Sequence, residues 1–86
     1  MIGRDITTIT GGFDADETGV DRFVVAMRRK LTKKRKEGRG GWNLDCEVSF
    51  LRALLAEHVG KGDMVDIANL AMMIWNREHP TGRTDD

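Results

Sequence analysis

The sequence lacks the residues and segments that would mark a secreted, metal-stabilised or membrane protein. Its single cysteine, Cys46, excludes an internal disulfide and a zinc site built from several cysteines. No apolar run is long enough to cross a bilayer, and no signal peptide is apparent. Strand-like alternation, internal repeats and low-complexity tracts are also missing. We therefore expect a helical protein of the cytoplasm without membrane attachment.

A net charge is lacking too, but the charges are unevenly distributed. The 14 basic and 14 acidic residues give a formal net charge of +0. Acidic residues gather between Asp5 and Asp21, and a basic run follows from Arg28 to Arg39. Such a run is either a solvated helix face or a surface for an anionic partner.

The spacing of apolar residues predicts an all-α fold of three helices. An apolar stripe indicates the first helix, from about Asp16 to Lys36, with Asp16 or Thr18 as its N-cap. The residues of this stripe are Val20, Phe23, Val24, Met27 and Leu31. Glycines that follow Lys36 are expected to end the helix.

Two shorter helices are expected to follow. The second is predicted over about 46–59, with Asp45 as N-cap and Val59 on its buried face. The glycines on either side of Lys61 should then break the chain into a short turn, which favours an antiparallel neighbour. The third helix is predicted to begin at Asp63, its N-cap, and to end near residue 78 because Pro80 follows.

The predicted domain is small and has much apolar surface. We expect a flexible N-terminal segment at 1–16, a helical domain at 17–79 and a tail at 80–86. A packed part this short often needs a partner, and the third helix is apolar over a wider surface than two short helices can cover. We therefore expect an antiparallel hairpin or three-helix unit completed by oligomerisation into a larger bundle, as a homo-oligomer, dimer or higher.

A polar row crosses the most apolar segment of the chain. Asp63, Asp66 and Asn69 are spaced by three residues, which places them along one edge of a helix. A buried carboxylate is costly unless it is paired, hydrogen-bonded or bound to a metal. Two interpretations stay open: the carboxylates ligate a cation such as Mg²⁺, or Asp63 is a cap while the others bond to backbone, Arg52 or Lys61.

A glycine-rich loop after the basic run is a second candidate site. Gly40 and Gly41 would expose backbone N–H groups, Arg39 would offer a forked donor to phosphate, and Trp42 would offer a face for base stacking. The alternative is a loop in which Trp42 anchors the core.

His58 is a third candidate, with Glu57 beside it and Lys61 three residues on. It is interpreted either as a general base or ligand, or as a histidine that interacts with carbonyls at a helix end. No Ser/His/Asp or Cys/His grouping indicates nucleophilic catalysis.

The chain resembles MazG-like proteins of the all-α nucleoside triphosphate pyrophosphohydrolase superfamily, particularly short phage-encoded members. The resemblance lies in three segments: Phe23–Leu31, Gly40–Trp42 and Asp66–Ile74. Enzymes of that family hold Mg²⁺ with an E-x-x-E motif on one helix and an E-x-x-D motif on the next. The second motif matches Asp63–Asp66, with Asp in place of the first Glu. The first would fall at His58–Lys61, where both carboxylates are missing.

The resemblance implies a nucleotide ligand, and the missing carboxylates imply that catalysis is lost. We expect a non-catalytic protein of phage or prophage type, in the host-cell cytoplasm, that binds a nucleotide or cyclic nucleotide without a cofactor. Sequestration of a nucleotide immune signal is a role implied by analogy with small phage proteins. The expected contacts are Arg39, Gly40, Gly41, Trp42, His58, Lys61, Asp66 and Asn69.

Three other functions were weighed. The main alternative is a Mg²⁺-dependent pyrophosphohydrolase with a reduced metal site at Asp63 and Asp66. Nucleic acid is a less expected partner, because a helix-turn-helix over 47–75 would present these two carboxylates to DNA phosphates. A pure interaction protein, such as an inhibitor of a host enzyme, is the third.

Overall fold

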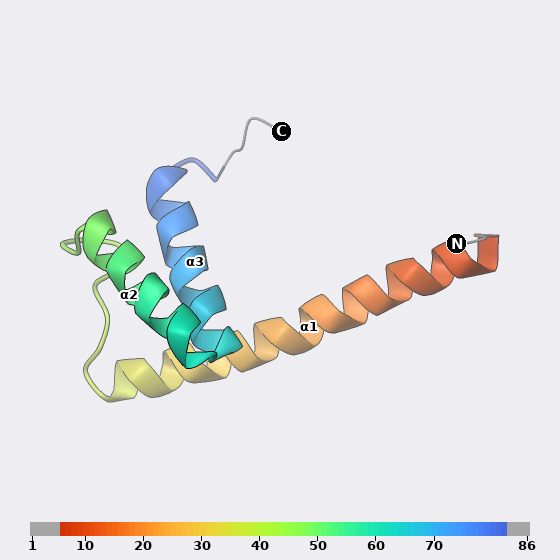
Figure 1. Ribbon diagram of the computed structural model, residues 1–86, viewed down its shortest axis with the longest axis horizontal. Coiled ribbons are helices and arrows are strands. Elements are labelled where there is room, and N and C mark those ends of the chain that lie inside the picture. Colours follow the sequence, from red (N-terminus) through yellow and green to blue (C-terminus); the bar gives the residue numbers. More distant parts are fainter. Residues whose placement is uncertain (1–5, 83–86) are drawn as a thin grey trace.

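The chain folds into three helices. The computed structural model describes the backbone of residues 6–82 and the side chains of residues 14–82. The helices are α1 (Ile6–Lys36), α2 (Val48–Lys61) and α3 (Met64–Glu78). Residues 6–82 contain no strand, so the described fold is all-α, as predicted (Figure 1). None of the helices in this range combines the length and apolarity that crossing a membrane requires.

The helices form a hairpin that stands on a longer helix. α2 and α3 run in opposite directions on either side of a tight turn, and α3 also packs against α1 (Figure 1). The hairpin meets α1 in the C-terminal half of that helix. The preceding half extends beyond the hairpin, and residues 14–23 are all exposed.

The start of α1 was predicted wrongly. The helix begins at Ile6 rather than near Asp16, so Asp16 and Thr18 lie within it and are not its N-cap. Once a helix has a nucleus, each further residue adds one hydrogen bond at little cost, and even a glycine costs only about 1 kcal/mol relative to alanine. Residues 1–5 of the expected flexible segment lie outside the described part.

The ends of α2 and α3 follow local capping rules more closely. α2 begins at Val48 with Glu47 as N-cap, not Asp45, and the Glu47 side chain makes no capping bond. Gly62 is the C-cap of α2, with φ at 81°, a conformation that favours glycine. Asp63 caps α3 as predicted, because its carboxylate accepts a hydrogen bond from the backbone N–H of Asp66 at 3.0 Å.

The hydrophobic core lies between α2 and α3. Leu51, Leu70 and Ile74 are its buried members. Partly buried side chains around them are Trp42, Cys46, Val48, Leu54, Leu55 and Met73. Val59, predicted on the buried face of α2, lies in the last turn of that helix and is 58 % exposed. Val20 and Phe23 of the α1 stripe are also exposed, since the hairpin does not reach them.

Candidate functional site

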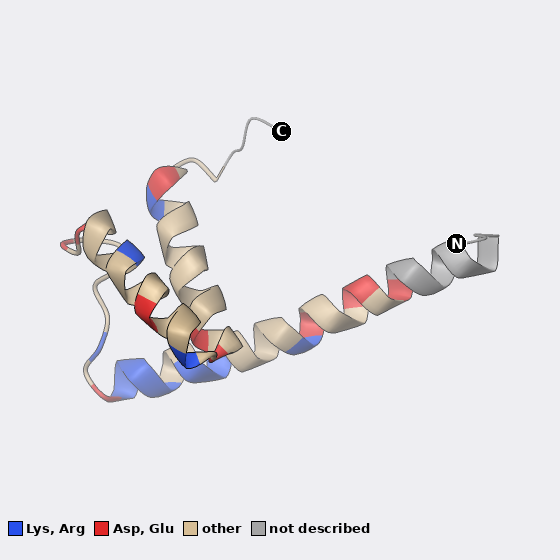
Figure 2. Ribbon diagram, in the orientation of Figure 1, with Lys and Arg blue, Asp and Glu red and all other residues tan. Residues whose placement is uncertain are grey.

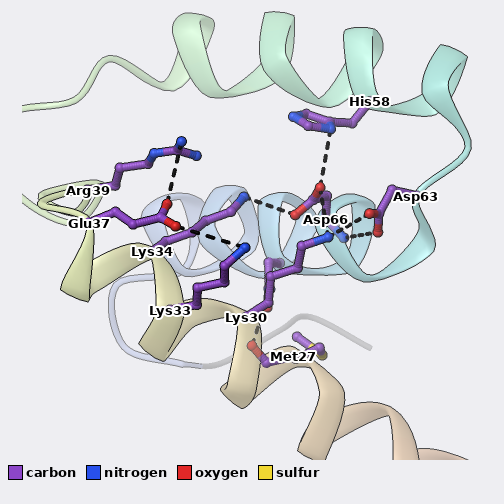
Figure 3. Close-up of polar contacts among 10 residues, drawn as sticks. Met27, Lys30, Lys33, Lys34, Glu37, Arg39, His58, Asp63 and Asp66 are labelled. Carbon is purple, nitrogen blue, oxygen red and sulfur yellow. Dashed lines mark hydrogen bonds and ion pairs between the residues drawn. The ribbon is translucent and has the colours of Figure 1, made fainter.

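The predicted polar row is present at the start of α3 and faces α1 (Figure 3). Asp66 and Asn69 are buried, with 7 % and 2 % of their surface exposed. Asp63 is partly exposed at the N-cap. The chain therefore buries one carboxylate and one amide in a core that has few apolar members, and both need polar partners.

Two lysines of α1 supply the partners of the carboxylates. Lys30 Nζ donates to Asp63 Oδ2 at 2.5 Å and lies 3.1 Å from Asp66 Oδ2. Lys34 Nζ donates to Asp66 Oδ1 at 2.9 Å. The lysines are four residues apart, so both ammonium groups project from one face of α1 toward α3 (Figure 3). The buried charge is paired across the two helices.

These contacts shift the pKa values of all three groups. The hydrogen bond from Lys30 is the main cause that lowers the pKa of Asp63 from 3.8 to about 2. Burial of Asp66 opposes its ionisation, but the hydrogen bonds from Lys34 and Lys30 outweigh this effect and lower its pKa. The hydrogen bond to Asp63 is the largest cause that raises the pKa of Lys30, and the hydrogen bond to Asp66 is the second largest. Asp63, Asp66 and Lys30 are therefore ionised at neutral pH.

His58 and Asn69 complete the cluster. His58 Nδ1, from α2, lies 3.6 Å from Asp66 Oδ2, which is longer than a hydrogen bond. The Asn69 amide donates to the backbone carbonyl of Met27 at 3.3 Å and so ties α3 to α1. His58 Nδ1 and Asn69 Oδ1 are buried atoms without a hydrogen-bond partner among the described residues.

The two basic residues that were predicted as alternative partners of the row lie elsewhere. Arg52 forms an ion pair with Glu78 at the other end of the hairpin. Lys61 is exposed and lies 3.6 Å from Glu57, one turn earlier on α2. The interpretation that the row has polar partners is thus right, but Lys30 and Lys34 take the place of these two.

The glycine-rich loop does not join the cluster. Arg39 is exposed and lies 3.5 Å from Glu37. Gly41 has φ at 83°, so the loop requires a glycine there. Trp42 packs against the core cluster, which is the anchoring position of the alternative interpretation. Its role in base stacking stays a prediction.

Arg77 holds this loop against α3. Its Nη1 atom donates to the backbone carbonyl of Trp42 at 2.7 Å and also to the carbonyl of Cys46. The sequence pattern did not predict this role of Arg77. Its position in the last turn of α3 favours binding to that helix's own carbonyls, so nothing local indicates a distant loop.

A basic groove lies beside the cluster, where α1 meets the start of α3. It has a volume of about 420 Å³ and is lined by Ala26, Arg29, Lys30, Lys33, Asp63 and Val65. Three cations and one carboxylate therefore face this space. The C-terminal half of α1 carries blue segments, interrupted by tan (Figure 2). The sequence shows the basic run from Arg28 to Arg39, but it does not indicate which of these residues line one groove.

The metal that the resemblance implies does not fit the residues present. Both carboxylates of the row are bound by lysine ammonium groups, which repel a cation. Among the described residues, no cluster of three or more His, Cys, Asp or Glu side chains is arranged to hold a metal. The lysines occupy the positions at which a cation would neutralise Asp63 and Asp66.

Comparison of the chain with protein-family models, with curated proteins and with solved structures finds no match. The resemblance to MazG-like proteins therefore rests on the motifs quoted above.

Proposed function

We propose that this chain is a non-catalytic nucleotide-binding protein whose phosphate site is the groove between α1 and the start of α3. The observation that carries the proposal is the excess of positive charge there. Arg29, Lys30 and Lys33 line the groove, against Asp63 as the one carboxylate in its lining.

Arg29 and Lys33 are the side chains assigned to phosphate. Lys30 is already paired with Asp63 and Asp66. It therefore contributes positive electrostatic potential to the groove rather than a free hydrogen-bond donor. Lys33 is exposed and its contact with Glu37 is long, at 3.9 Å. An arginine fork and a mobile ammonium group together suit a phosphate oxygen cluster.

The buried members of the row have a supporting role in this proposal. Asp66 and Asn69 are too buried to contact a ligand in this conformation. Asp66 instead fixes Lys30 and Lys34, and Asn69 fixes the α1 backbone through the carbonyl of Met27. Arg39, which shares Glu37 with Lys33, extends the basic edge toward the loop.

Binding is proposed to be independent of metal. In a pyrophosphohydrolase, metal ions neutralise the phosphates and activate water. Here Lys30 and Lys34 neutralise the carboxylates that would hold such ions. The chain's own cations can attract phosphate, but no described residue stands out as the activator of water.

The ligand class and the assembly belong to the same proposal. The motifs that resemble short phage-encoded MazG-like proteins support a nucleotide or cyclic nucleotide, and sequestration of an immune signal by a phage or prophage product is the proposed role. We also propose a homo-oligomer that completes a larger helical bundle. Mass spectrometry of an extract released by heating the purified protein tests whether a nucleotide co-purifies.

Isothermal titration in EDTA tests the binding site. AMP, ATP and cyclic di-GMP are titrated into the wild type and into the double variant Arg29→Gln/Lys33→Gln. Because a hydrogen bond to a charged group contributes about 1.5–3 kcal/mol, we expect the variant to bind at least about tenfold more weakly.

The matched control is Arg22→Gln/Lys36→Gln, which removes the same charge from the same helix but leaves the groove lining intact. It should bind as the wild type does. Absence of binding across the nucleotide panel contradicts the proposal. Release of pyrophosphate from ATP with Mg²⁺ or Mn²⁺, abolished by Asp66→Ala, would instead establish the enzyme alternative.

A further inference from the structure

Four exposed charged residues of α1 recur at every seventh position: Asp14, Asp21, Arg28 and Arg35. Seven residues are close to two helical turns, so these side chains follow one face of the helix. Their signs run acid, acid, base, base along the chain. Among the side chains that the structure describes, none of the four has an ion-pair partner.

This face is not the one that packs against the hairpin. The side chains of Lys30 and Lys34 bond to α3, as does the backbone carbonyl of Met27. At 3.6 residues per turn, Arg28 lies on nearly the opposite side of α1 from Lys30. Among the residues that the structure describes, none therefore packs on the charged face, and the basic groove lies off it.

The protomer is also more extended than a chain of its length that folds alone. Its radius of gyration is 16.3 Å, whereas a compact domain of 86 residues has about 12 Å. Val25, midway along the charged face, is 45 % exposed, and Val20 on α1 is 58 % exposed. A long helix that packs along half of its length and exposes valines is expected to have a partner.

We propose that the partner is a second copy of this chain, whose α1 packs antiparallel along the charged face. The four positions are symmetric about the point between Val24 and Val25. Asp14 and Arg35 lie equally far from that point on either side of it, and so do Asp21 and Arg28. A two-fold axis at that point places Asp14 opposite the partner's Arg35 and Asp21 opposite the partner's Arg28. Symmetry repeats both pairs.

The sign pattern selects the antiparallel arrangement. In a parallel pair in register, Asp14 and Asp21 would face their own copies and Arg28 and Arg35 would do the same, which is repulsive. In the antiparallel pair, every one of these charges meets its opposite. The valines at the axis add the apolar contact, and the charges fix the direction and register.

Charge reversal in the full-length chain tests the proposal, with mass measured by light scattering during size-exclusion chromatography. The wild type should have twice the 9.7 kDa mass of the chain. Asp14→Arg/Asp21→Arg makes all four charges positive, and Arg28→Asp/Arg35→Asp makes all four negative. Each variant alone should be monomeric, with dimerisation weakened at least about tenfold, because four attractive pairs become repulsive.

Mixing the two variants in equal amounts should restore a dimer, and circular dichroism of each variant alone checks that it is helical. The control Arg29→Asp/Lys33→Asp introduces the same charge change on another face of α1 and should remain dimeric. A monomeric wild type, a reversal variant that dimerises alone as the wild type does, or a mixture that stays monomeric overturns the proposal.

Discussion

Asp66 is buried among basic groups that come from both neighbouring helices. Lys30 and Lys34 approach its two oxygens from α1, and His58 approaches from α2. Burial opposes the ionisation of this carboxylate, which is 7 % exposed, but the hydrogen bonds from Lys34 and Lys30 outweigh that effect and lower its pKa. The stability of the helix junction therefore depends on keeping both sides of this cluster.

Removal of Lys34 should destabilise the fold. Lys34→Met keeps the length of the side chain but leaves Asp66 Oδ1 without its hydrogen bond at 2.9 Å. We expect the free energy of unfolding to fall by about 1–3 kcal/mol in urea denaturation. Lys33→Met is the control, because the Lys33 side chain is 76 % exposed, and it should change the free energy by less than about 0.5 kcal/mol. Equal effects of the two substitutions would contradict this account.

The pair between Lys30 and Asp63 predicts a loss of stability in acid. The pKa of Asp63 is about 2 in the folded chain against an ordinary value of 3.8. This carboxylate therefore stabilises the fold at pH values above 3.8 and loses that contribution as the pH falls toward 2. Asp63→Asn keeps a capping side chain but removes the charge.

Thermal unfolding between pH 6 and pH 2 measures the effect. The wild type should have the higher Tm at pH 6, and the difference from Asp63→Asn should narrow as the pH approaches 2. A difference that stays constant over this range would exclude titration of Asp63 as its cause.

At the residue scale, the sequence predicted the polar row but not its partners. The spacing of Asp63, Asp66 and Asn69 requires nothing beyond the helix that carries them. Predicting Lys30 and Lys34 as the partners of this row requires knowledge of how α1 crosses α3. Their four-residue spacing beside the apolar stripe was the available signal, yet other members of the basic run are spaced in the same way.

At the scale of elements, the helix ends that depend on local chemistry were predictable. Asp63 begins α3 through its own side chain, and Pro80 follows the end near residue 78. The start of α1 was missed because its glycines and threonines have low helix propensity, which a growing helix overrides at small cost. Glu47 rather than Asp45 precedes α2, and its side chain forms no cap that a pattern could reveal.

Two glycines at the end of α2 should respond oppositely to the same substitution. Gly62 has φ at 81° and its N–H bonds to the carbonyl of His58 at 2.9 Å, so Gly62→Ala should lower the free energy of unfolding by about 1 kcal/mol. Gly60 lies within the helix, and an added Cβ would meet no atom within 4 Å. Gly60→Ala should therefore raise the free energy of unfolding by up to about 1 kcal/mol. Urea denaturation of both variants measures the difference, and a change of the same sign in both would contradict it.

At the scale of the whole molecule, the apolar stripe of α1 is only partly covered by the other helices. The sequence predicted one apolar stripe from Val20 to Leu31, but the hairpin reaches only its C-terminal part. The predicted class and helix count depend on periodicity, which is local. The crossing of α1 and the groove beside it depend on contacts between residues more than thirty positions apart, and no single-sequence pattern encodes these.

The bonds from Arg77 to the loop before α2 also affect how freely that loop can change in evolution. Arg77 binds the backbone carbonyls of Trp42 and Cys46, and every residue type offers a backbone carbonyl. The exposed residues between them, Asn43–Asp45, contribute no side chain to this attachment. Their identities can therefore vary while the path of the chain is kept, so new surface chemistry can arise there without a new fold.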